Sequence, residues 1–260
     1  KNFVEEAFRA AEKNPILIDK FIDHAMEVDV DAISDGKEVH VAGIMQHIEE
    51  AGIHSGDSGC SLPPYTLSDD IVSDLKEQAS KLAKALKVIG LMNAQFAIKN
   101  DEIFLLEANP RASRTAPFVS KAIGLQLAKL GALVMSGISI KDLNLPKSIK
   151  NSSYFSVKEA VFPFSKFPEV DVLLGPEMKS TGEVMGIDTN FGRAFAKSQL
   201  GAGISLPLSG SVFISVKDAD KEAFIPICRD LFDLGFTILA TGGTTEAAIK
   251  LSKTLLESPT

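Results

Sequence analysis

Four side chains with metal-ligand chemistry occur on two neighbouring segments of this sequence, 93–99 and 103–109. They are Asn93, Gln95, Glu107 and Asn109. Both segments alternate polar and apolar residues as β-strands do, and the Asn-Asp pair between them is typical of a turn. Directly opposed residues of an antiparallel hairpin point to the same face. We therefore expect the four side chains to form one patch of amide and carboxylate oxygens.

This patch depends on the register of the hairpin. A loop of the three residues 100–102 places Gln95 opposite Glu107, and the same loop brings the two asparagines together. A two-residue loop shifts the pairing by one residue and breaks up the patch, because side chains alternate between the faces of a strand. We expect the three-residue loop, with Lys99 opposite Ile103.

Two arginines, Arg111 and Arg114, follow the patch after a proline that stops the second strand. Hard oxygen ligands beside guanidinium groups suit Mg²⁺ that bridges the phosphates of a nucleotide. The alternative interpretation is a solvated face, which is the commoner role of polar residues on a hairpin. A set of Gln, Glu and Asn, rather than Lys and Thr, argues against that alternative here.

Composition limits the class of protein. The chain has 260 residues, is 45% hydrophobic and 23% charged, and carries a formal net charge of −7. These values are ordinary for one or two globular domains, and the acidic balance argues against a nucleic-acid partner. No apolar run approaches membrane-spanning length, so we expect no membrane partner. Cys60 and Cys228 are expected to be reduced thiols in a cytoplasmic protein.

The elements that must position the patch begin upstream of it. Residues 27–33 alternate strictly, with three carboxylates on one face, and residues 38–45 are expected to return as the partner strand. A short apolar strand is expected over 16–22. The Gly/Ser-rich loop 52–59 is of a kind that lets backbone N–H groups approach an anion, although most such loops are only turns.

Two helices are expected around the hairpin. Ser68 is a good N-cap for a helix with an apolar stripe, and Gly90 is expected to terminate it. Residues 117–136 are expected to form one almost wholly apolar helix.

The rest of the chain contains the following expected elements: a strand at 156–162, a loop-like stretch at 175–183, a helix at 190–200, and a strand–helix–strand unit at 212–216, 221–234 and 236–240. A strand–helix–strand unit of this length implies a parallel crossover. Residues 241–245, which lead into an expected helix at 246–252, form either a phosphate site or a plain turn.

Six groups of short sequence strings together indicate a family. They are Phe21-Ile22-Asp23 with Glu27-Val28-Asp29-Val30-Asp31; Glu49-Glu50-Ala51-Gly52-Ile53-His54-Ser55-Gly56-Asp57-Ser58; Met92-Asn93-Ala94-Gln95-Phe96-Ala97; Glu107-Ala108-Asn109-Pro110-Arg111-Ala112-Ser113-Arg114-Thr115; Ser156-Val157-Lys158-Glu159; and Leu174-Gly175-Pro176-Glu177-Met178-Lys179-Ser180-Thr181-Gly182-Glu183. Together they resemble the large chain of carbamoyl phosphate synthetase over essentially the whole sequence.

That large chain holds two similar ATP-grasp halves, and the strings resemble the second. The resemblance implies an α+β ATP-grasp core, an antiparallel sheet with helices, over residues 1–145. The remainder of the core and a connection are expected over 146–208. Residues 209–260 are expected to begin an α/β Rossmann-like regulatory domain of the methylglyoxal-synthase type.

The resemblance also implies an activity: ATP-dependent phosphorylation of carbamate to carbamoyl phosphate, for pyrimidine and arginine biosynthesis. ATP and Mg²⁺ or Mn²⁺ are the cofactors that it implies. A small glutamine amidotransferase subunit is the expected partner, because it supplies ammonia in this family, and the full enzyme is expected to be an oligomer in the cytoplasm.

Roles for single residues follow from the matching positions. Lys20 to Ile22 are expected to line the adenine, and Glu27 to hold the ribose unless it is merely an exposed carboxylate. The remaining nucleotide contacts are expected from Gly52, Ile53, His54 and Ser55; the metal ligands from Gln95, Glu107 and Asn109; and the phosphate and carbamate contacts from Arg111 and Arg114, beside Asn109.

Effector sites are implied at two further places. Lys221, Thr241 and Thr244 match the region where the family binds nucleotide effectors through phosphate. Glu49, Asp57 and Glu159 match the acidic positions that bind ornithine in some bacterial members.

Two other readings compete with this one. The first is another ATP-grasp ligase, such as a biotin carboxylase or a purine-pathway carboxylate–amine ligase. The second is a non-catalytic regulatory module. The chain also opens without Met and lacks the phosphate-binding lid that precedes this region in the family, so both ends look cut from a longer protein. We expect this polypeptide alone to bind nucleotide poorly and to turn over little.

Overall fold

The computed structural model describes residues 2–11, 14–16, 18, 21–146, 153–167 and 169–244. The chain divides into two compact units, a first unit of Lys1–Ile204 and a second unit of Ser205–Thr260. The described residues within 16–22 form no strand, contrary to the expectation. Lys20 and the helix expected at 246–252 lie outside the described residues.

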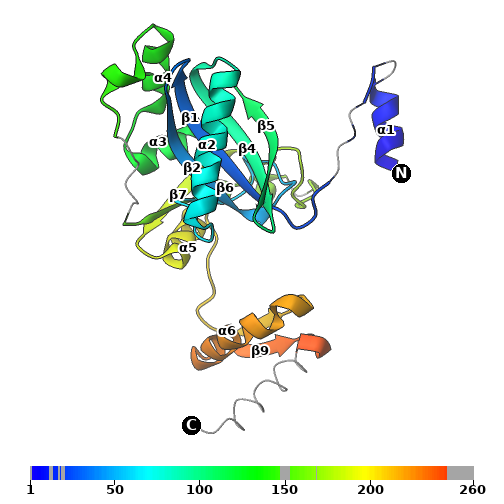
Figure 1. Cartoon of the computed structure of the whole chain (residues 1–260). Coiled ribbons are helices and arrows are strands. Elements are labelled where there is room, and N and C mark those ends of the chain that lie inside the picture. Colours follow the sequence, from blue (N-terminus) through cyan, green and yellow to red (C-terminus); the bar gives the residue numbers. More distant parts are fainter. Residues whose placement is uncertain are drawn as a thin grey trace. The chain divides into compact units, whose positions relative to one another are not determined.

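An antiparallel sheet of seven strands is the frame of the first unit (Figure 1). In chain order its strands are β1 (Met26–Asp35), β2 (Val39–Glu50), β3 (Cys60–Leu62), β4 (Ile89–Lys99), β5 (Glu102–Asn109), β6 (Phe155–Val161) and β7 (Gly182–Asp188). They lie side by side in the order β5-β4-β1-β2-β3-β6-β7. The strand pair expected from residues 27–33 and 38–45 is confirmed as β1 and β2.

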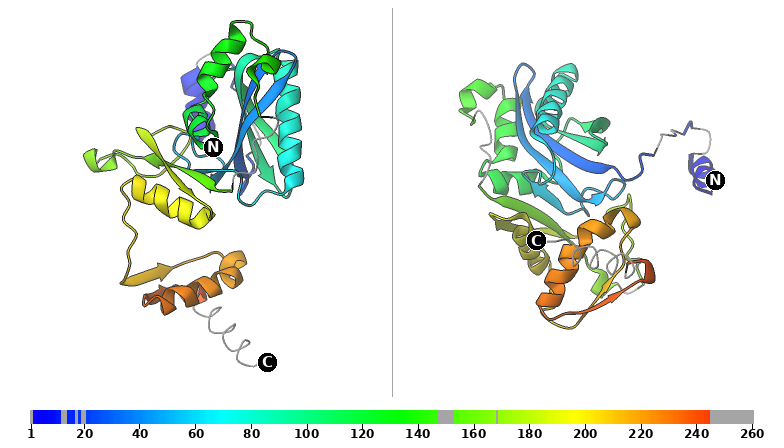
Figure 2. Two further views of the ribbon diagram at one scale, coloured as in Figure 1. Left: turned by 90° about the vertical axis from the view of Figure 1, so that its left-hand side faces the viewer. Right: turned by 60° about the horizontal axis from the view of Figure 1, so that its bottom comes forward.

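Helices cover both faces of this sheet. They are α2 (Asp69–Ala85), α3 (Ala116–Ile123), α4 (Leu127–Met135) and α5 (Phe191–Gly201), with α1 (Asn2–Ala11) at the start of the chain and short 3-10 turns at Ile140–Leu143 and Phe164–Lys166. The left view of Figure 2 shows the strands between α2 on one side and α3 and α4 on the other.

Strand β1 serves both faces because successive side chains of a strand point in opposite directions. Val28 and Val30 are fully buried in the cluster that contains the apolar face of α2. The carboxylates of Glu27, Asp29 and Asp31 alternate with them and are each 5% exposed or less. The strand therefore supplies apolar core on one face and a row of buried acids on the other.

The start of α2 follows the sequence, but its end does not. The Ser68 hydroxyl accepts the Ile71 N–H at 3.3 Å, as an N-cap does. The helix ends at Ala85, and Lys87 adopts the left-handed conformation with φ 54°. The prediction that Gly90 terminates the helix is wrong, because Gly90 already belongs to β4.

The apolar segment 117–136 forms two helices rather than one. Gly124 takes φ 72° directly after α3, a conformation that glycine adopts without the steric cost of a side chain. The axes of α3 and α4 are bent by 109° at this break. Among the described residues no single helix is long and apolar enough to cross a membrane, and only this bent pair reaches the required length and composition together.

The β4–β5 hairpin reaches the expected pairing by an unexpected route. Its loop has two residues, Asn100 and Asp101, both with positive φ (52° and 63°), and Lys99 pairs with Glu102. Positive φ at both loop residues is typical of a type I′ turn, whose twist matches that of the flanking strands, and the three-residue loop that we expected is wrong.

A β-bulge then restores the register of this hairpin. The pairing shifts between Gln95 and Phe96, so that Phe96 pairs with Leu105 while Gln95 pairs with Glu107, and Leu106 is the extra residue. The expected pairing of Asn93 with Asn109 is therefore confirmed, although the loop that was to produce it is wrong. Bulges of this kind re-aim side chains next to functional sites.

The last part of the first unit packs α5 on β6 and β7. The stretch 175–183 was expected to be loop-like, but β7 already begins at Gly182. Gly186 in β7 faces α5, and a Cβ there would overlap the backbone of Ala194 and Ser198. A glycine is therefore required at this position for the helix to lie against the strand.

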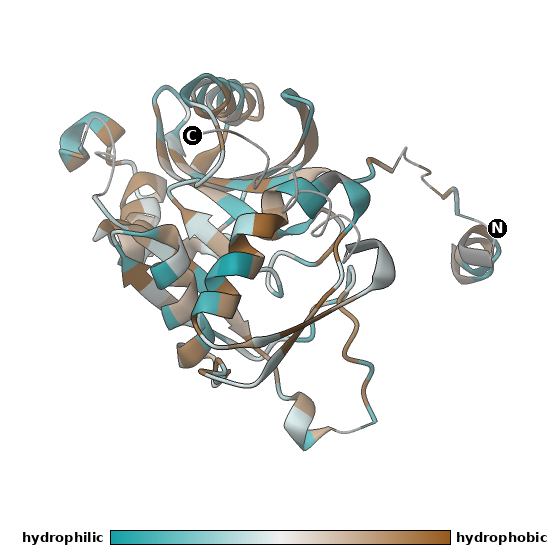
Figure 3. Ribbon diagram, turned by 90° about the horizontal axis from the view of Figure 1, so that it is seen from below, coloured by the Kyte–Doolittle hydropathy of each residue, from teal (hydrophilic) through white to brown (hydrophobic). Residues whose placement is uncertain are grey.

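The second unit contains β8 (Ser211–Ile214), α6 (Lys221–Asp233) and β9 (Thr237–Ala240), with a short 3-10 turn at Asp218–Asp220. Strands β8 and β9 pair in parallel, as expected from the strand–helix–strand pattern. Gly235 ends α6 with φ 90°. In the hydropathy view of Figure 3 the helices of the chain mix hydrophilic and hydrophobic residues along their length, as amphipathic helices do.

Candidate nucleotide-binding site

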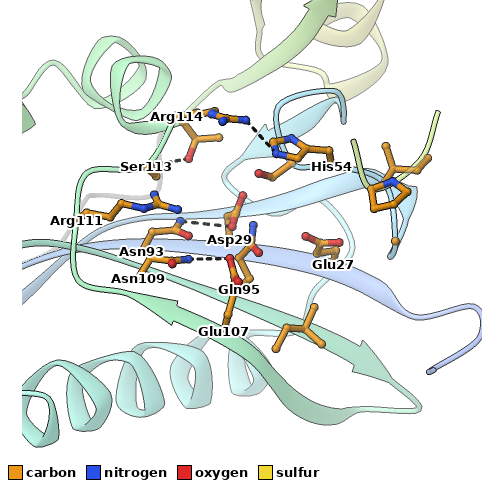
Figure 4. A pocket seen from close by; sticks show the side chains of 16 residues that line it. Glu27, Asp29, His54, Asn93, Gln95, Glu107, Asn109, Arg111, Ser113 and Arg114 are labelled. Carbon is orange, nitrogen blue, oxygen red and sulfur yellow. Dashed lines mark hydrogen bonds between the residues drawn. The ribbon is translucent and has the colours of Figure 1, made fainter. Parts of the chain in front are cut away.

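A cavity of about 430 Å³ lies in the first unit where β1, β4 and β5 meet three loops. Figure 4 shows its side chains. It brings together eleven residues that the sequence singled out: Glu27, Gly52, Ile53, His54, Ser55, Asn93, Gln95, Glu107, Asn109, Arg111 and Arg114. Residues from distant segments of the chain, 27 to 114, therefore converge on one place.

Other residues of the cavity were not predicted as site residues, and one that was predicted is absent from its lining. Ile22 is described but does not line the cavity. Asp29, Leu106, Ser113, Thr115 and Pro176 line it without having been predicted to do so. The signal for Asp29 was present in the sequence, because it lies in the same alternating row of carboxylates as Glu27.

The oxygen-ligand patch lies at the edge of this cavity. The Asn109 side-chain N–H donates to Oε1 of Glu107 at 2.7 Å, which leaves the Asn109 oxygen and the second Glu107 oxygen available (Figure 4). Gln95 lies directly opposite Glu107 across the strand pair. With Asn93, which pairs with Asn109, the patch contains one carboxylate and three amides.

A second layer of carboxylates lies behind the patch on the neighbouring strand. Asp29 pairs with Gln95 across β1 and β4, and Asp31 pairs with Asn93. The Asn93 side-chain N–H donates to Asp31 at 2.9 Å and to Asp29 at 3.4 Å. An amide whose N–H groups are held from behind has its orientation restricted, which is how residues behind a ligand position it.

Asp29 and His47 form a buried ion pair beneath the cavity. Nε2 of His47 lies 3.0 Å from Oδ2 of Asp29, and each side chain is 1% exposed. Burial is the largest single influence and opposes both charges. The mutual hydrogen bond and charge attraction, together with the Asn93 and Gln95 amides at Asp29 and the charge of Glu27 at His47, outweigh it, so that the pKa of Asp29 is lowered and the pKa of His47 is raised.

Glu27 lies near the loop at Gly52. Burial raises the pKa of Glu27, although the charge of His47 and a backbone hydrogen bond from Gly52 act in the opposite direction. Its carboxylate is an acceptor placed on the wall of the cavity. A carboxylate in this position suits a pair of ligand hydroxyls.

Arg114 contacts His54, whose ring cannot accept hydrogen bonds at both of its nitrogens while it is neutral. Its NH1 lies 2.9 Å from Nε2 of His54, while the Gly56 N–H points at Nδ1 of the same ring at 3.0 Å. A neutral imidazole carries one N–H, so one of these two contacts always sets a donor against a donor. Burial and the charge of Arg114 lower the pKa of His54. Arg114 is therefore available to an anion that enters the cavity.

The three acidic residues predicted to bind an effector lie elsewhere in the first unit. Glu49 accepts the Gly59 N–H at 2.8 Å, and Glu159 accepts from the Gln199 amide at 2.6 Å. Burial and the charge of Glu49 raise the pKa of Glu159 to about 7. Asp57 instead accepts two backbone N–H groups, from the residues at 179 and 180. Burial opposes its charge, but the Ser180 side chain, these two N–H groups and the charge of His54 together lower its pKa.

The predicted effector residues of the second unit lie close together. The Thr241 and Thr244 hydroxyls are 3.0 Å apart. Lys221 begins α6 and pairs with Asp218 at 2.6 Å. A side chain added at Gly243 would place its Cβ 3.1 Å from the Lys221 ammonium, so the lysine lies over this loop.

Comparison with known proteins places these features in a family. Residues 1–143 match the family model of the carbamoyl-phosphate synthase L chain, ATP binding domain. The chain is 54% identical to the carbamoyl phosphate synthase large chain of Methanobrevibacter smithii over 250 residues, which are 95% of this chain and 24% of that one. It is 52% identical to the C-terminal section of the large chain of Aquifex aeolicus, over 94% of this chain and 48% of that protein.

The chain thus spans about a quarter of the first of these relatives and about half of the second. Among solved structures, the biotin carboxylase domain of a single-chain bacterial carboxylase resembles it with a TM-score of 0.51 at 17% identity, over 62% of this chain and 37% of that one. This likeness confirms an ATP-grasp fold, an antiparallel sheet with helices, for the matched part. The chain belongs to the family of carbamoyl-phosphate synthase L chain, ATP-binding domains.

Proposed function

We propose that this chain provides the site at which ATP phosphorylates carbamate to carbamoyl phosphate, within a longer ligase. The observation that carries the proposal is the cavity, which joins an oxygen-ligand patch to two arginines and a Gly/Ser-rich loop. The family match and the relatives named above support the same activity. They do not favour another ATP-grasp ligase or a purely regulatory module.

The nucleotide is proposed to enter along β1 and the loop at 52–55. Glu27 holds the ribose hydroxyls. The backbone at residues 21 and 22 contacts the adenine beside Gly52, where an added Cβ would lie 3.7 Å from the Phe21 ring. The loop of Gly52, Ile53, His54 and Ser55 lies against the nucleotide on the other side. Its glycine supports a close approach of backbone to ligand, since Gly52 has φ 111°.

Mg²⁺ or Mn²⁺ is proposed to bind at Gln95, Glu107 and Asn109. Among the described residues, no three His, Cys, Asp or Glu side chains gather as a metal-binding group. The donor set nevertheless fits these ions, because Mg²⁺ typically takes one or two carboxylates and shares its other positions with water and phosphate. When bound, the cation would neutralise charge on the phosphates.

Arg111 and Arg114 are proposed to contact the transferred phosphoryl group and the carbamate. Phosphoryl transfer needs little covalent chemistry from the protein, so catalysis rests on position and on neutralisation of charge. The contacts that the structure describes for the Arg114 guanidinium, with His54 and Met178, both use NH1, which leaves its other nitrogens to meet the phosphate.

We also propose a partner subunit, a location and two effector sites for the full enzyme. A glutamine amidotransferase subunit supplies ammonia, and the full enzyme is a cytoplasmic oligomer. Residues 209–260 begin a Rossmann-like regulatory domain that binds a nucleotide effector through phosphate at Lys221, Thr241 and Thr244. Glu49, Asp57 and Glu159 bind ornithine. The parallel pairing of β8 and β9 supports the domain assignment.

The test uses the complete large chain and measures ATP formation from carbamoyl phosphate and ADP. Glu107→Gln should lower the rate by about 100-fold or more, because it removes the one carboxylate of the ligand patch. Glu102→Gln, at the exposed end of the same strand, is the matched control and should leave the rate unchanged. An unchanged rate in Glu107→Gln would contradict the proposal.

A further inference from the structure

Asp31 is a buried carboxylate whose role is not explained by any direct contact with the cavity. It is 2% exposed and does not belong to the lining. Its hydrogen-bond partners are neutral: the Asn93 amide at 2.9 Å, the Ser113 hydroxyl at 2.8 Å and the Thr115 hydroxyl at 3.2 Å. A buried carboxylate satisfied only by neutral donors is costly, so its retention calls for a reason.

Two of these donors lie on the loop that carries the arginines. Ser113 and Thr115 directly flank Arg114, and their hydroxyls also lie 3.0 Å from each other. The described backbone of residues 110–115 forms neither helix nor strand. The backbone hydrogen bonds described for this loop run from the Arg111 N–H to the Asn109 carbonyl at 2.8 Å and from the Val119 N–H to the Thr115 carbonyl at 2.9 Å.

The third donor ties the same carboxylate to the ligand patch. Asn93 pairs with Asn109 across β4 and β5, and its amide N–H donates to Oδ1 of Asp31 while the two hydroxyls donate to Oδ2. One carboxylate therefore connects three segments: its own strand β1, strand β4 and the arginine loop.

We infer that Asp31 is a positioning residue, which holds the arginine loop at a fixed distance from the oxygen-ligand patch. The inference rests on the proposed function and adds a residue that touches neither nucleotide nor metal. Without this anchor the guanidinium groups would still bind phosphate, but they would not be held where the transferred group passes. Misplacement of a catalytic group by about 1 Å costs roughly 100-fold in rate.

The experiment measures kcat and KM for ADP in the complete large chain, with ATP formation from carbamoyl phosphate as the readout. Asp31→Ala should lower kcat by about 100-fold and change KM for ADP by less than about threefold, because nucleotide contacts remain. Asp31→Asn should recover most of kcat, since its oxygen accepts from Asn93 and its N–H₂ donates to the hydroxyls, which reverse their direction.

A matched variant on the same strand distinguishes a role of Asp31 in positioning the arginine loop from a role in stability alone. Asp35 accepts backbone N–H groups from residues 37, 38 and 140, far from the arginine loop. Asp35→Ala should lower the melting temperature and leave kcat unchanged. If Asp31→Ala does not fold, the pair Ser113→Ala with Thr115→Val removes the same contacts from the loop side and should show the same loss of kcat.

The outcomes separate this inference from the proposed function. A normal kcat in both Asp31→Ala and the double loop variant overturns the inference, as does a loss that appears in KM alone. If Glu107→Gln abolishes the reaction while these variants keep it, only the inference fails. If Glu107→Gln keeps the reaction, the proposed function fails with it.

Discussion

Single buried carboxylates of the first unit differ in what balances their charge. Asp29 has a histidine, Asp57 has two backbone N–H groups, and Glu159 has an amide from Gln199. Glu159 also lies near Glu49, which carries the same charge. Water is partly excluded from this site and screens the repulsion less than it does at the surface, so the pKa of Glu159 is raised. Glu159 thus combines burial with a neighbouring like charge, so its protonation should affect stability.

Glu159→Gln should change the pH dependence of stability. The pKa of Glu159 is raised in the folded protein from 4.5 to about 7, so the folded state holds this proton more tightly than the unfolded state. The stabilisation is present at low pH and is lost as the pH rises through about 7. Urea unfolding should show the variant to be more stable than the parent at about pH 8, by on the order of 1 kcal/mol after allowance for solvent screening, and equal to it below about pH 4, where the carboxyl is protonated in both states.

The exposed Glu177 offers the control for this experiment. Glu177→Gln should leave the difference in unfolding free energy between the two pH values unchanged. If Glu159→Gln shows no gain at the higher pH, the mutual repulsion assigned to the two buried glutamates is wrong.

Among the elements, the β4–β5 hairpin contains two features that shift the strand pairing by one residue in opposite directions. The two-residue turn shifts the pairing by one, and the extra residue Leu106 shifts it back. Leu106 also lines the cavity, so the bulge has a second effect besides register.

Deletion of one leucine from the Leu105–Leu106 pair should separate these effects. The remaining chain can pair as a regular ladder in which Gln95 still faces Glu107, but the cavity loses an apolar wall residue. We expect KM for ADP to rise by about tenfold, from the loss of roughly 1–2 kcal/mol of apolar contact, with kcat less affected. An unchanged KM, or a collapse of the fold measured by circular dichroism, would show that the bulge does something else.

Strand β7 and helix α5 form a second element pair with a sharp test. Gly186→Ala should lower the free energy of unfolding by about 3 kcal/mol, because its Cβ would overlap the backbone of Ala194 and Ser198, which cannot move aside as a side chain can. Gly175→Ala is the control, since no heavy atom lies within 4 Å of its added Cβ. Equal urea midpoints for the two variants would rule out this packing.

Much of the sheet and its site was readable from the sequence because alternation is a local signal. The strict pattern of β1 predicted its strand and partner, and the polar residues of the hairpin predicted the ligand patch. The turn at Asn100 and Asp101 was misjudged, because a bulge further along the chain compensates for it and leaves no local pattern. The end of α2 was misplaced for a related reason: Lys87 takes a conformation usually left to glycine.

Other parts of the site depend on tertiary contacts that no spacing reveals. Ser113 and Thr115 look like ordinary loop residues, and only the fold brings them to Asp31, 82 and 84 residues away in sequence. Pro176 reaches the cavity from a distant loop in the same way. The carboxylate row of β1 was visible, but its burial behind β4 was not.

For the whole molecule, the division into two compact units has an experimental consequence. Residues 203–210 between them are exposed, and Leu208 is 90% exposed. Exposed backbone without regular hydrogen bonding is the preferred site of proteolysis. Brief digestion with chymotrypsin should cut first after Leu206 or Leu208 and release a fragment that ends there, as mass spectrometry would show. A first cut within β1 or β4 would contradict the compactness of the first unit.

The two-sided character of strand β1 offers a route for protein engineering. Val28 and Val30 share a cluster with α2, whereas Glu27 and Asp29 on the opposite face line the cavity. A combinatorial library that varies only Val28, Val30 and their contacts on α2 would search for a higher melting temperature. Glu27 and Asp29 would stay unchanged in every member of the library. Thermal stability can therefore be selected on one face of this strand without substitution of the residues that line the cavity.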